Sequence, residues 1–387
     1  MRRLHVAIDA RLPDLGQGGV LSVVKAMTQA FQKVDDAGFR RTWIVLKQAD
    51  WWRDSLPDGD LTIEISMPAG SVAAKLPALS SRIAPAVLKV LGDHSYLDER
   101  LSDAEVDVVH LPYQDGVFTE LPFVYFPHDL QHHYLPENFT TAQIRHRETR
   151  WKRRALSATR VVAAGEHVKR DLIQLWGVPN EKILVYPFPP PLKPSLATSA
   201  LPPRREPYVI YPAVFWPHKN HQVLIEAMAI LKARGSKLHL LLTGAKNATF
   251  PAVIRHIEQR DLANRVHYAG HVDESELSEL ISRSEAVVLP SLFEAVSLTA
   301  YDAIRAGRPL ACSDREFFRT QCGERALYFD PIDPVSIAGA IETVTQPGRL
   351  SSDPGVLSVA LATQLSLETF AENLYKTYQL CATDSIR

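Results

Sequence analysis

Short apolar runs alternate with amphipathic stretches along the second half of the chain. Residues 208–215 (YVIYPAVF), 237–244 (KLHLLLTG) and 286–291 (AVVLPS) each have the length and composition of one buried strand. Between the first two, residues 221–235 repeat apolar side chains at helical spacing and end on a glycine. Short buried strands that alternate with helices are typical of a parallel, doubly wound sheet, and we predict one here.

The first half shows the same alternation with longer insertions. The pattern of residues 21–31 predicts a helix that begins near Val20. The runs that predict strands are 4–10, 42–47, 106–112, 122–129 and 160–166. Ligands of such sheets bind beyond the carboxyl ends of the strands. We therefore predict an α/β fold with two Rossmann-like domains, each a doubly wound parallel sheet, that face each other across a ligand-binding cleft.

Proline marks the boundary between the two halves. Residues 187–207 hold eight of the 27 prolines of the chain, and proline removes backbone donors and favours extended chain. We predict an N-terminal domain over residues 1–190, a linker over 191–206 and a C-terminal domain over 207–365. Residues 366–387 predict a last helix that can pack back on the N-terminal domain.

Composition narrows the functional classes. Lys and Arg number 43 against 44 Asp and Glu, so no excess of basic charge points to nucleic acid. The three cysteines form no C-x-x-C pair, and the N-terminal apolar run is too short for a signal peptide. No run reaches the roughly 18 apolar residues of a membrane span. We expect a cytoplasmic protein, soluble or peripheral at the inner face of the membrane.

The most informative motif is SLFEAVSLTAYDAIRAG, residues 291–307. Glu294 lies in a loop after a strand, and Asp302 follows eight residues later in the second turn of a helix. Three N–H groups at the start of this helix would point at an anion: those of Ser297, Leu298 and Thr299. Two carboxylates beside such a site suit a ligand with phosphates and hydroxyls. The alternative is an ordinary helix with a solvated Asp302.

A second motif, YPAVFWPHKNHQVLIEA (211–227), places Lys219 and Asn220 between a strand and a helix. An ammonium group and free backbone donors can converge there on a diphosphate. The alternative is a solvated loop lysine.

Histidines gather in FPHDLQHHYLPENF, residues 126–139. A metal site is a poor interpretation of His128, His132 and His133, because the zinc motif H-E-x-x-H needs a glutamate in second position and no third ligand is evident. His132 and His133 can equally be surface residues. Asp58-Gly59-Asp60 imitates a D-x-D metal motif within a turn-rich loop, and we discount it. We therefore predict no metal.

These motifs together resemble the retaining family-4 glycosyltransferases, which have the GT-B fold. The stretch 291–307 is similar to their E-x7-E element, and residues 211–227 to the basic loop that holds the leaving pyrophosphate. The chain departs from the family in several places. Ala295 and Ser297 replace glycines, Thr299 replaces proline and Asp302 replaces the second glutamate. Phe215 and Trp216 stand in the neighbourhood where an arginine is usual.

The resemblance implies a role for each matching residue. Lys219, Glu294 and His128 are the expected catalytic residues: Lys219 stabilises the diphosphate, and Glu294 and His128 contact the donor sugar. Asp302 is expected at the ribose. The further donor-binding residues are Gly18, Gly19, Asn220, Gly244, Ser297, Leu298 and Thr299. No cofactor is expected beyond the nucleotide-sugar substrate.

The resemblance also suggests the substrates. The contexts HDLQH and FWPHKNH are similar to mannosyltransferases of polysaccharide assembly, which favours GDP-mannose as the donor and a saccharide or lipid-linked saccharide as the acceptor. Residues 72–92 and the basic stretch 145–160 can contact a membrane or an acceptor, or be ordinary amphipathic and solvated helices. Two other functions stay open: a nucleotide-sugar epimerase of the same fold, and a degenerate nucleotide- or carbohydrate-binding protein.

Overall fold

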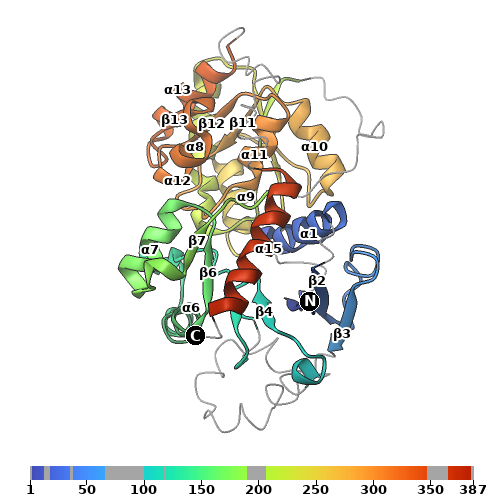
Figure 1. Cartoon of the computed structure of the whole chain (residues 1–387). Coiled ribbons are helices and arrows are strands. Elements are labelled where there is room, and N and C mark those ends of the chain that lie inside the picture. Colours follow the sequence, from blue (N-terminus) through green and yellow to red (C-terminus); the bar gives the residue numbers. More distant parts are fainter. Residues whose placement is uncertain are drawn as a thin grey trace. The chain divides into compact units, whose positions relative to one another are not determined.

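The structure is a computed structural model of the chain that describes residues 2–12, 18–34, 38–65, 100–116, 119–189, 206–346 and 365–384. The chain forms two compact units. Met1–Pro191 and Thr363–Arg387 make the N-terminal unit, and Leu192–Ala362 make the C-terminal unit. Each unit is built around its own sheet (Figure 1).

The N-terminal unit has a seven-stranded parallel sheet in the order β3-β2-β1-β4-β5-β6-β7. Its strands are β1 (Leu4–Ala10), β2 (Phe39–Leu46), β3 (Leu61–Ile65), β4 (Val108–Leu111), β5 (Phe123–Tyr125), β6 (Arg160–Ala163) and β7 (Ile183–Val185). The two edge strands, β3 and β7, were not predicted from the sequence. β3 has a single buried residue, Ile63, and β7 has three residues, so neither presents a long apolar run.

Helices and short turns connect these strands. The helices are α1 (Gly18–Lys33), α4 (Gln131–Tyr134), α5 (Thr141–His146), the π-helical turn η3 (Arg147–Trp151), α6 (Lys152–Ser157), α7 (Glu166–Trp176) and α15 (Leu367–Asp384), and the 3-10 turns are η2 (Pro136–Asn138) and η4 (Asn180–Lys182). α1 begins at Gly18, two residues before the predicted start.

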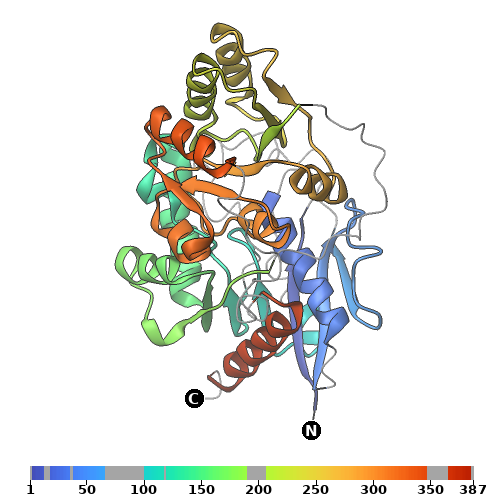
Figure 2. The ribbon, with the colours of Figure 1, turned by 90° about the horizontal axis from the view of Figure 1, so that it is seen from above.

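The last helix, α15, belongs to the N-terminal unit. It packs on α1 and on β4, β5 and β6, and Figure 2 shows the red α15 beside the blue α1, as Figure 1 does. Two buried tyrosines fix it: Arg41 donates to the hydroxyl oxygen of Tyr375 at 2.7 Å, and Nδ1 of His110 lies 2.7 Å from the hydroxyl oxygen of Tyr378.

The C-terminal unit has a six-stranded parallel sheet in the order β10-β9-β8-β11-β12-β13. Its strands are β8 (Tyr208–Pro212), β9 (His239–Thr243), β10 (Val266–Tyr268), β11 (Ala286–Leu289), β12 (Leu310–Ser313) and β13 (Leu327–Phe329). The helices are α8 (His221–Ala233), α9 (Phe250–Gln259), α10 (Glu274–Ser282), α11 (Leu298–Arg305), α12 (Glu316–Cys322) and α13 (Pro334–Val344), and the 3-10 turns are η5 (Pro217–Lys219) and η6 (Gly323–Arg325).

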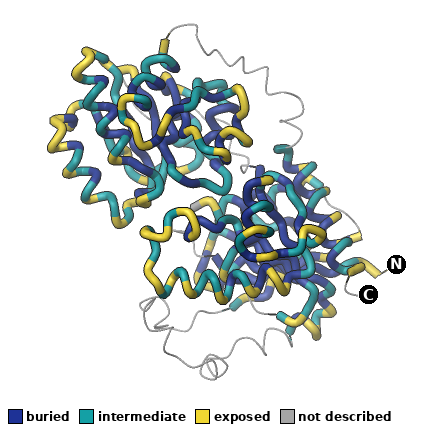
Figure 3. The backbone as a smooth tube through the Cα atoms, turned by 90° about the vertical axis from the view of Figure 1, so that its left-hand side faces the viewer, coloured by how far each residue is buried: buried dark blue, intermediate teal, exposed yellow. Residues whose placement is uncertain are grey.

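Both sheets lie at the centre of their units, where Figure 3 shows the buried residues gathered. The strand order confirms the predicted doubly wound α/β architecture. In each sheet the order reverses beside the first strand: between β1 and β4 in one, and between β8 and β11 in the other. Loops that follow the strands on either side of such a switch point form the usual ligand-binding edge.

Several sequence predictions fall outside the described residues or find a structural explanation. The linker over 191–206 lies outside them except for Glu206, and the stretch 72–92 lies wholly outside them. The carboxylate of Asp60 is buried against Arg41 at 2.9 Å and accepts from Nε1 of Trp43 at 2.7 Å, so it is not a metal ligand of a D-x-D motif. In the parts of the chain that are described, no helix is long and apolar enough to cross a membrane.

Candidate active site

In the C-terminal unit, Lys219 and Glu294 meet in an ion pair. Lys219 ends η5, after β8, and Glu294 lies in the loop after β11, the strand next to β8. The ammonium nitrogen of Lys219 lies 2.5 Å from Oε1 of Glu294, and the two side chains are 20% and 13% exposed. The structure therefore joins the two predicted catalytic residues of this unit at the switch point of the sheet.

Asn220 holds the loops around this pair together. It adopts a left-handed backbone (φ 58°) before α8, and its side-chain amide donates to the carbonyl oxygens of Pro290 at 3.1 Å and Pro331 at 2.7 Å. These three residues belong to the loops after β8, β11 and β13. The structure thus gives this predicted donor-binding side chain a structural task, in which both amide hydrogens are used.

Tyr211, on β8, holds the same loop through its hydroxyl group. Its hydroxyl donates to the carbonyl oxygen of Lys219 at 2.8 Å and lies 3.1 Å from the Ser291 hydroxyl. Burial raises the pKa of Tyr211 well above its usual value, and the nearby carboxylate of Glu294 adds to the effect. Tyr211 is therefore a neutral donor that fixes the backbone at Lys219.

The start of α11 differs from the prediction at the N–H group of Ser297. Ser297 is the N-cap, and its hydroxyl accepts from the N–H of Ala300 at 3.3 Å. Its own N–H does not point at a ligand, because it donates to Oε1 of Gln321 at 2.9 Å, while Nε2 of Gln321 donates back to the Ser297 carbonyl oxygen at 2.6 Å. The prediction for the N–H of Ser297 was wrong. Leu298 and Thr299, at the first two helical positions, keep N–H groups that can meet an anion.

Gln321 could not have been found from the motif. It lies 24 residues beyond Ser297, on α12, and a glutamine in a helix carries no sequence signal for such a clamp. Asp302 lies where it was predicted, in the second turn of α11, and is nearly buried.

Gly244, another predicted donor-binding residue, is required by packing. It follows β9 with φ +131°, and a Cβ there would lie 2.2 Å from the carbonyl oxygen of Ala213. Its own carbonyl oxygen accepts from the hydroxyl of Tyr268 at 2.7 Å. The glycine lets the loops after β8 and β9 approach each other closely.

Phe215 is buried where the family has its arginine. Its ring stacks on the imidazole of His221 with centroids 4.3 Å apart and planes 15° apart. Burial lowers the pKa of His221 to about 3, helped by the nearby charges of Lys219 and His218. His221 is thus a neutral stacking partner at the start of α8, and Lys219 is the cation that the motif retains.

In the N-terminal unit, His128 follows β5 in a strained backbone. Its φ is 61°, and the N–H of Asp129 donates to the carbonyl oxygen of Pro127 at 2.8 Å, so His128 is the central residue of a γ-turn. Such a residue costs roughly 1–3 kcal/mol and persists where its surroundings hold it.

The His128 ring is fixed as well. Nε2 lies 2.8 Å from the carbonyl oxygen of Pro112 and must donate to it, which leaves the lone pair of the neutral ring on Nδ1. Burial lowers the pKa of His128, so the ring is neutral at physiological pH. This predicted catalytic histidine can therefore accept one hydrogen bond from a hydroxyl.

The predicted glycine loop lies partly outside the described residues. Gly18 and Gly19 form the first turn of α1, after the carboxyl end of β1. In the described part of the chain, a Cβ at Gly19 would meet no heavy atom within 4 Å, so packing does not explain this glycine.

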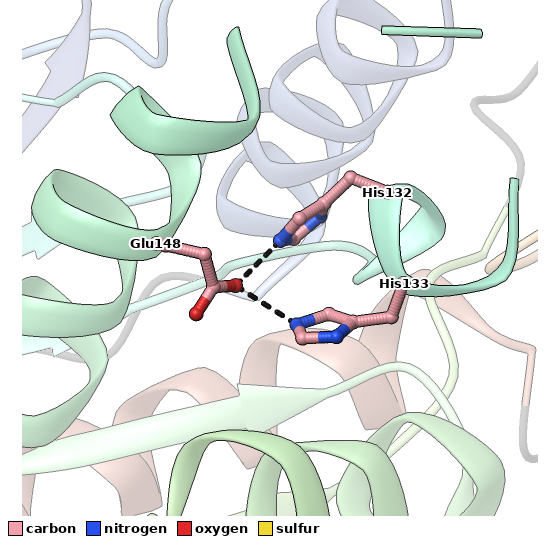
Figure 4. A group of neighbouring side chains, drawn as sticks. All are labelled: His132, His133 and Glu148. Carbon is pink, nitrogen blue, oxygen red and sulfur yellow. Dashed lines mark hydrogen bonds and ion pairs between the residues drawn. The ribbon is translucent and has the colours of Figure 1, made fainter. Parts of the chain in front are cut away.

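His132 and His133 have a partner that the sequence did not reveal. Their Nε2 atoms lie 2.7 and 2.8 Å from the same carboxylate oxygen of Glu148, on η3 (Figure 4). The three ligand atoms lie within 4.8 Å of one another. The statement that no third ligand is evident was wrong, because Glu148 is 15 residues from His133 in the sequence and comes near only in the fold.

The basic stretch 145–160 is only partly solvated. Arg154 is buried and donates to the carbonyl oxygens of Gln114 and Gly116 at 3.2 and 2.7 Å, and Arg147 lies 3.6 Å from a carboxylate oxygen of Asp129. These two arginines fix loops after β4 and β5 and are not spare cations.

Comparison with known protein families accounts for most of the chain. Residues 195–353 match the family described as glycosyl transferases group 1, and residues 18–188 match glycosyltransferase family 4.

Curated relatives include the O-antigen chain mannosyltransferase B of Escherichia coli, 22% identical over 65% of this chain and 69% of that protein. Another is the O-antigen chain mannosyltransferase RfbU of Salmonella typhimurium, 24% identical over 57% of this chain and 60% of that protein. The match thus spans under two thirds of the Salmonella protein.

A solved structure shares the fold. Anabaena HepE, in complex with UDP and glucose, superposes with a TM-score of 0.67 at 16% identity, over 97% of this chain and all of that one. With the two family matches, the two parallel sheets and the site geometry, these findings show that the chain belongs to the family-4 type of glycosyltransferases and has the GT-B fold.

Proposed function

We propose that the enzyme is a retaining mannosyltransferase that transfers mannose from GDP-mannose to a saccharide or lipid-linked saccharide acceptor. The observation that carries this proposal is the pair of Lys219 and Glu294 at the switch point of the C-terminal sheet. The names of the two curated mannosyltransferase relatives support the choice of sugar.

Lys219 is proposed to stabilise the departing diphosphate. Negative charge develops there as the glycosidic bond breaks, and a fixed ammonium group is worth most where charge develops in the transition state. The N–H groups of Leu298 and Thr299 add donors at a helix N-terminus. In the ion pair of this structure Glu294 is the counter-ion of Lys219, so a donor diphosphate competes with Glu294 for the ammonium and frees the carboxylate for sugar hydroxyls.

The remaining residues orient the sugar and the nucleoside. Glu294 is proposed to bind sugar hydroxyls, and Asp302 the ribose. His128 can accept a hydrogen bond from a sugar hydroxyl at Nδ1, because Nε2 already donates to Pro112. No residue is proposed as a covalent nucleophile or as a general base: the acceptor hydroxyl gives its proton to the leaving phosphate, and the product keeps the α configuration of the donor.

No metal or cofactor has a part in this proposal, because Lys219 and helix N–H groups take the role of a cation at the diphosphate. The acceptor is proposed to be a saccharide, free or linked to a lipid at the cytoplasmic face of the membrane.

A donor panel tests the proposal. The protein is incubated with GDP-mannose, UDP-glucose, UDP-galactose and UDP-N-acetylglucosamine, with and without acceptor extracts, and released nucleoside diphosphate is measured. We expect release from GDP-mannose that depends on the acceptor. Conversion of the donor without acceptor would favour an epimerase, and binding without turnover would favour a degenerate binding protein. Turnover of a UDP-sugar but not of GDP-mannose would refute the choice of donor.

A further inference from the structure

One carboxylate oxygen in the N-terminal unit collects three N–H donors from two other segments. Oε1 of Glu148 accepts from Nε2 of His132 at 2.7 Å, from Nε2 of His133 at 2.8 Å and from Nε1 of Trp176 at 2.9 Å. We call these four residues the Glu148 cluster. It joins α4, the π-helical turn η3 and the end of α7. Figure 4 shows three of its members, His132, His133 and Glu148.

The residue before Glu148 acts on the same loop. Arg147 lies 3.6 Å from Oδ1 of Asp129, and its guanidinium lies over the rings of Phe139 and Trp151 at 4.3 and 4.1 Å. Oδ1 of Asp129 also accepts from the N–H of Gln131 at 3.1 Å, at the start of α4. Consecutive residues of one π-helical turn, with opposite charges, thus hold both the start and the middle of segment 129–134. π-Helical turns occur frequently at functional sites.

These contacts lie directly after the strained γ-turn at His128. A left-handed backbone at a histidine is unfavourable unless the flanking chain is fixed, and α4 has only four residues to fix it by its own hydrogen bonds. The Glu148 cluster adds hydrogen bonds that fix the chain after His128, which the short helix cannot supply by itself.

We propose that Glu148 is a positioning residue that keeps His128 in its γ-turn by holding His132 and His133. The proposal rests on the proposed function only for the part that His128 plays in turnover. The carboxylate is ionised at neutral pH: burial raises the pKa of Glu148, but the hydrogen bonds from Trp176 and His132 outweigh it and the pKa is lower than usual.

The same three side chains have the ligand types of a zinc site, and two observations favour the positioning role. Nδ1 of His132 is buried and has no hydrogen-bond partner among the described residues. A metal on Nε2 would place a proton on this nitrogen, whereas metal-bound histidines almost always donate that proton to an acceptor. Lys152 also lies 3.9 Å from Oε2 of Glu148, and its positive charge opposes a second cation.

Hydrogen exchange of the full-length protein tests the positioning role without any substrate. Glu148→Gln should speed exchange of the amides in 126–134 about tenfold or more, because the neutral amide binds the imidazoles more weakly. Glu137→Gln, the same chemical change at an exposed glutamate of the same loop, should leave it unaltered. Unaltered exchange in Glu148→Gln would overturn the proposal. His133→Gln is the milder second variant should Glu148→Gln lower the Tm of the whole protein.

A double-mutant cycle tests the link to His128. We expect Glu148→Gln to lower kcat about tenfold in the wild-type background and less than twofold in a His128→Ala background, because the histidine to be positioned is gone. An equal loss in both backgrounds would show a merely structural role and overturn the proposal. Titration with Zn²⁺ decides the remaining alternative: stoichiometric binding tighter than about 1 µM that is lost in His133→Ala would replace the positioning role by a metal site. If no donor is turned over at all, the proposed function fails while the exchange experiment still decides on Glu148.

Discussion

The loops at the ligand-binding edges of the two sheets are held by different kinds of groups, charged in one unit and neutral in the other. After β5, the loop with His128 is held by charged groups, with Arg147 on Asp129 and Glu148 on two histidines. After β8 and β11, the loops around the ion pair are held by neutral amides that bind backbone groups, Asn220 on two carbonyls and Gln321 on Ser297.

The difference follows from what each edge presents to a substrate. The C-terminal edge displays charges of its own, Lys219 and Glu294. Under the proposed function these charges bind the diphosphate and the sugar, and neutral amide anchors do not compete with them. The N-terminal edge displays a neutral imidazole, because burial lowers the pKa of His128 more than the nearby carboxylate of Asp129 raises it. Under the two proposals, charge therefore acts in the chemical step in one unit and in positioning in the other.

The largest expected effect comes from removing Lys219, the proposed catalytic cation. Lys219→Ala should raise the activation free energy by about 2–4 kcal/mol, which lowers kcat roughly 30- to 1000-fold. Its effect on donor binding should be smaller. His128→Ala should cost about tenfold, since it removes one hydrogen bond to a neutral ring. Steady-state kinetics with the donor found in the panel measures both, with Lys237→Ala, an exposed lysine of the same unit, as the control. A wild-type kcat in Lys219→Ala would contradict the proposal that charge in the C-terminal unit acts in the chemical step.

The two carboxylates of the C-terminal motif should differ in kind. Glu294→Gln should lower kcat by about tenfold or more, because its charge can follow the positive charge that develops on the sugar. Asp302→Asn should mainly raise KM for the donor, and Asp302→Glu should be tolerated, because only a ground-state contact to ribose is asked of it. If Asp302→Asn lowers kcat as much as Glu294→Gln at unchanged KM, this division of roles is wrong.

How much of this could be predicted from sequence depends on the range of each interaction. Strands were predicted in both sheets where buried parallel strands produce long apolar runs. β3 and β7, which lie at the two opposite edges of the N-terminal sheet, were missed. Lys219 and Glu294 were noticed because each follows a strand, and parallel strands bring such positions to one edge. Their expected roles came from the resemblance to the family-4 glycosyltransferases. The anchors were missed, since Gln321 and Glu148 act across 24 and 15 or 16 residues through contacts that exist only after folding.

Removing the Asn220 anchor should destabilise the protein more than it alters chemistry. Asn220→Ala leaves two buried carbonyls without a donor and puts alanine in a left-handed backbone, for a loss of about 3 kcal/mol in the free energy of unfolding. Asn220→Gly keeps the backbone free to adopt that conformation and should lose about 1 kcal/mol less. Denaturant unfolding of the full-length protein compares the two, and equal losses would show that backbone strain at this position is not significant.

Acid should weaken the C-terminal unit through His221. The pKa of this histidine in the folded state, about 3, lies below the value near 6.5 of an exposed histidine, so only the unfolded chain binds the proton between these pH values. Stability from this group is therefore fully present above about pH 6.5 and is lost as the pH falls toward 3. His221→Phe, which keeps the stack on Phe215, should reduce the drop in Tm between pH 7.5 and 5. An unchanged drop would mean that other groups carry the acid sensitivity.

Chelation should have the smallest effect. Activity should be unchanged in EDTA, because protein cations and N–H groups are proposed to stabilise the leaving group. Loss of activity that Mn²⁺ or Mg²⁺ restores would place a metal in the chemical step and would contradict the assignment of that role to Lys219.

The configuration of the product tests the central claim most directly. A proton NMR time course follows GDP-mannose and the acceptor that supports turnover, with wild-type enzyme and with Glu294→Gln as the slow control. The account predicts an α-linked mannoside as the first product, at a rate that falls in the variant together with the release of nucleoside diphosphate. A β-linked product, free mannose as the sole product, or an epimerised donor would contradict it.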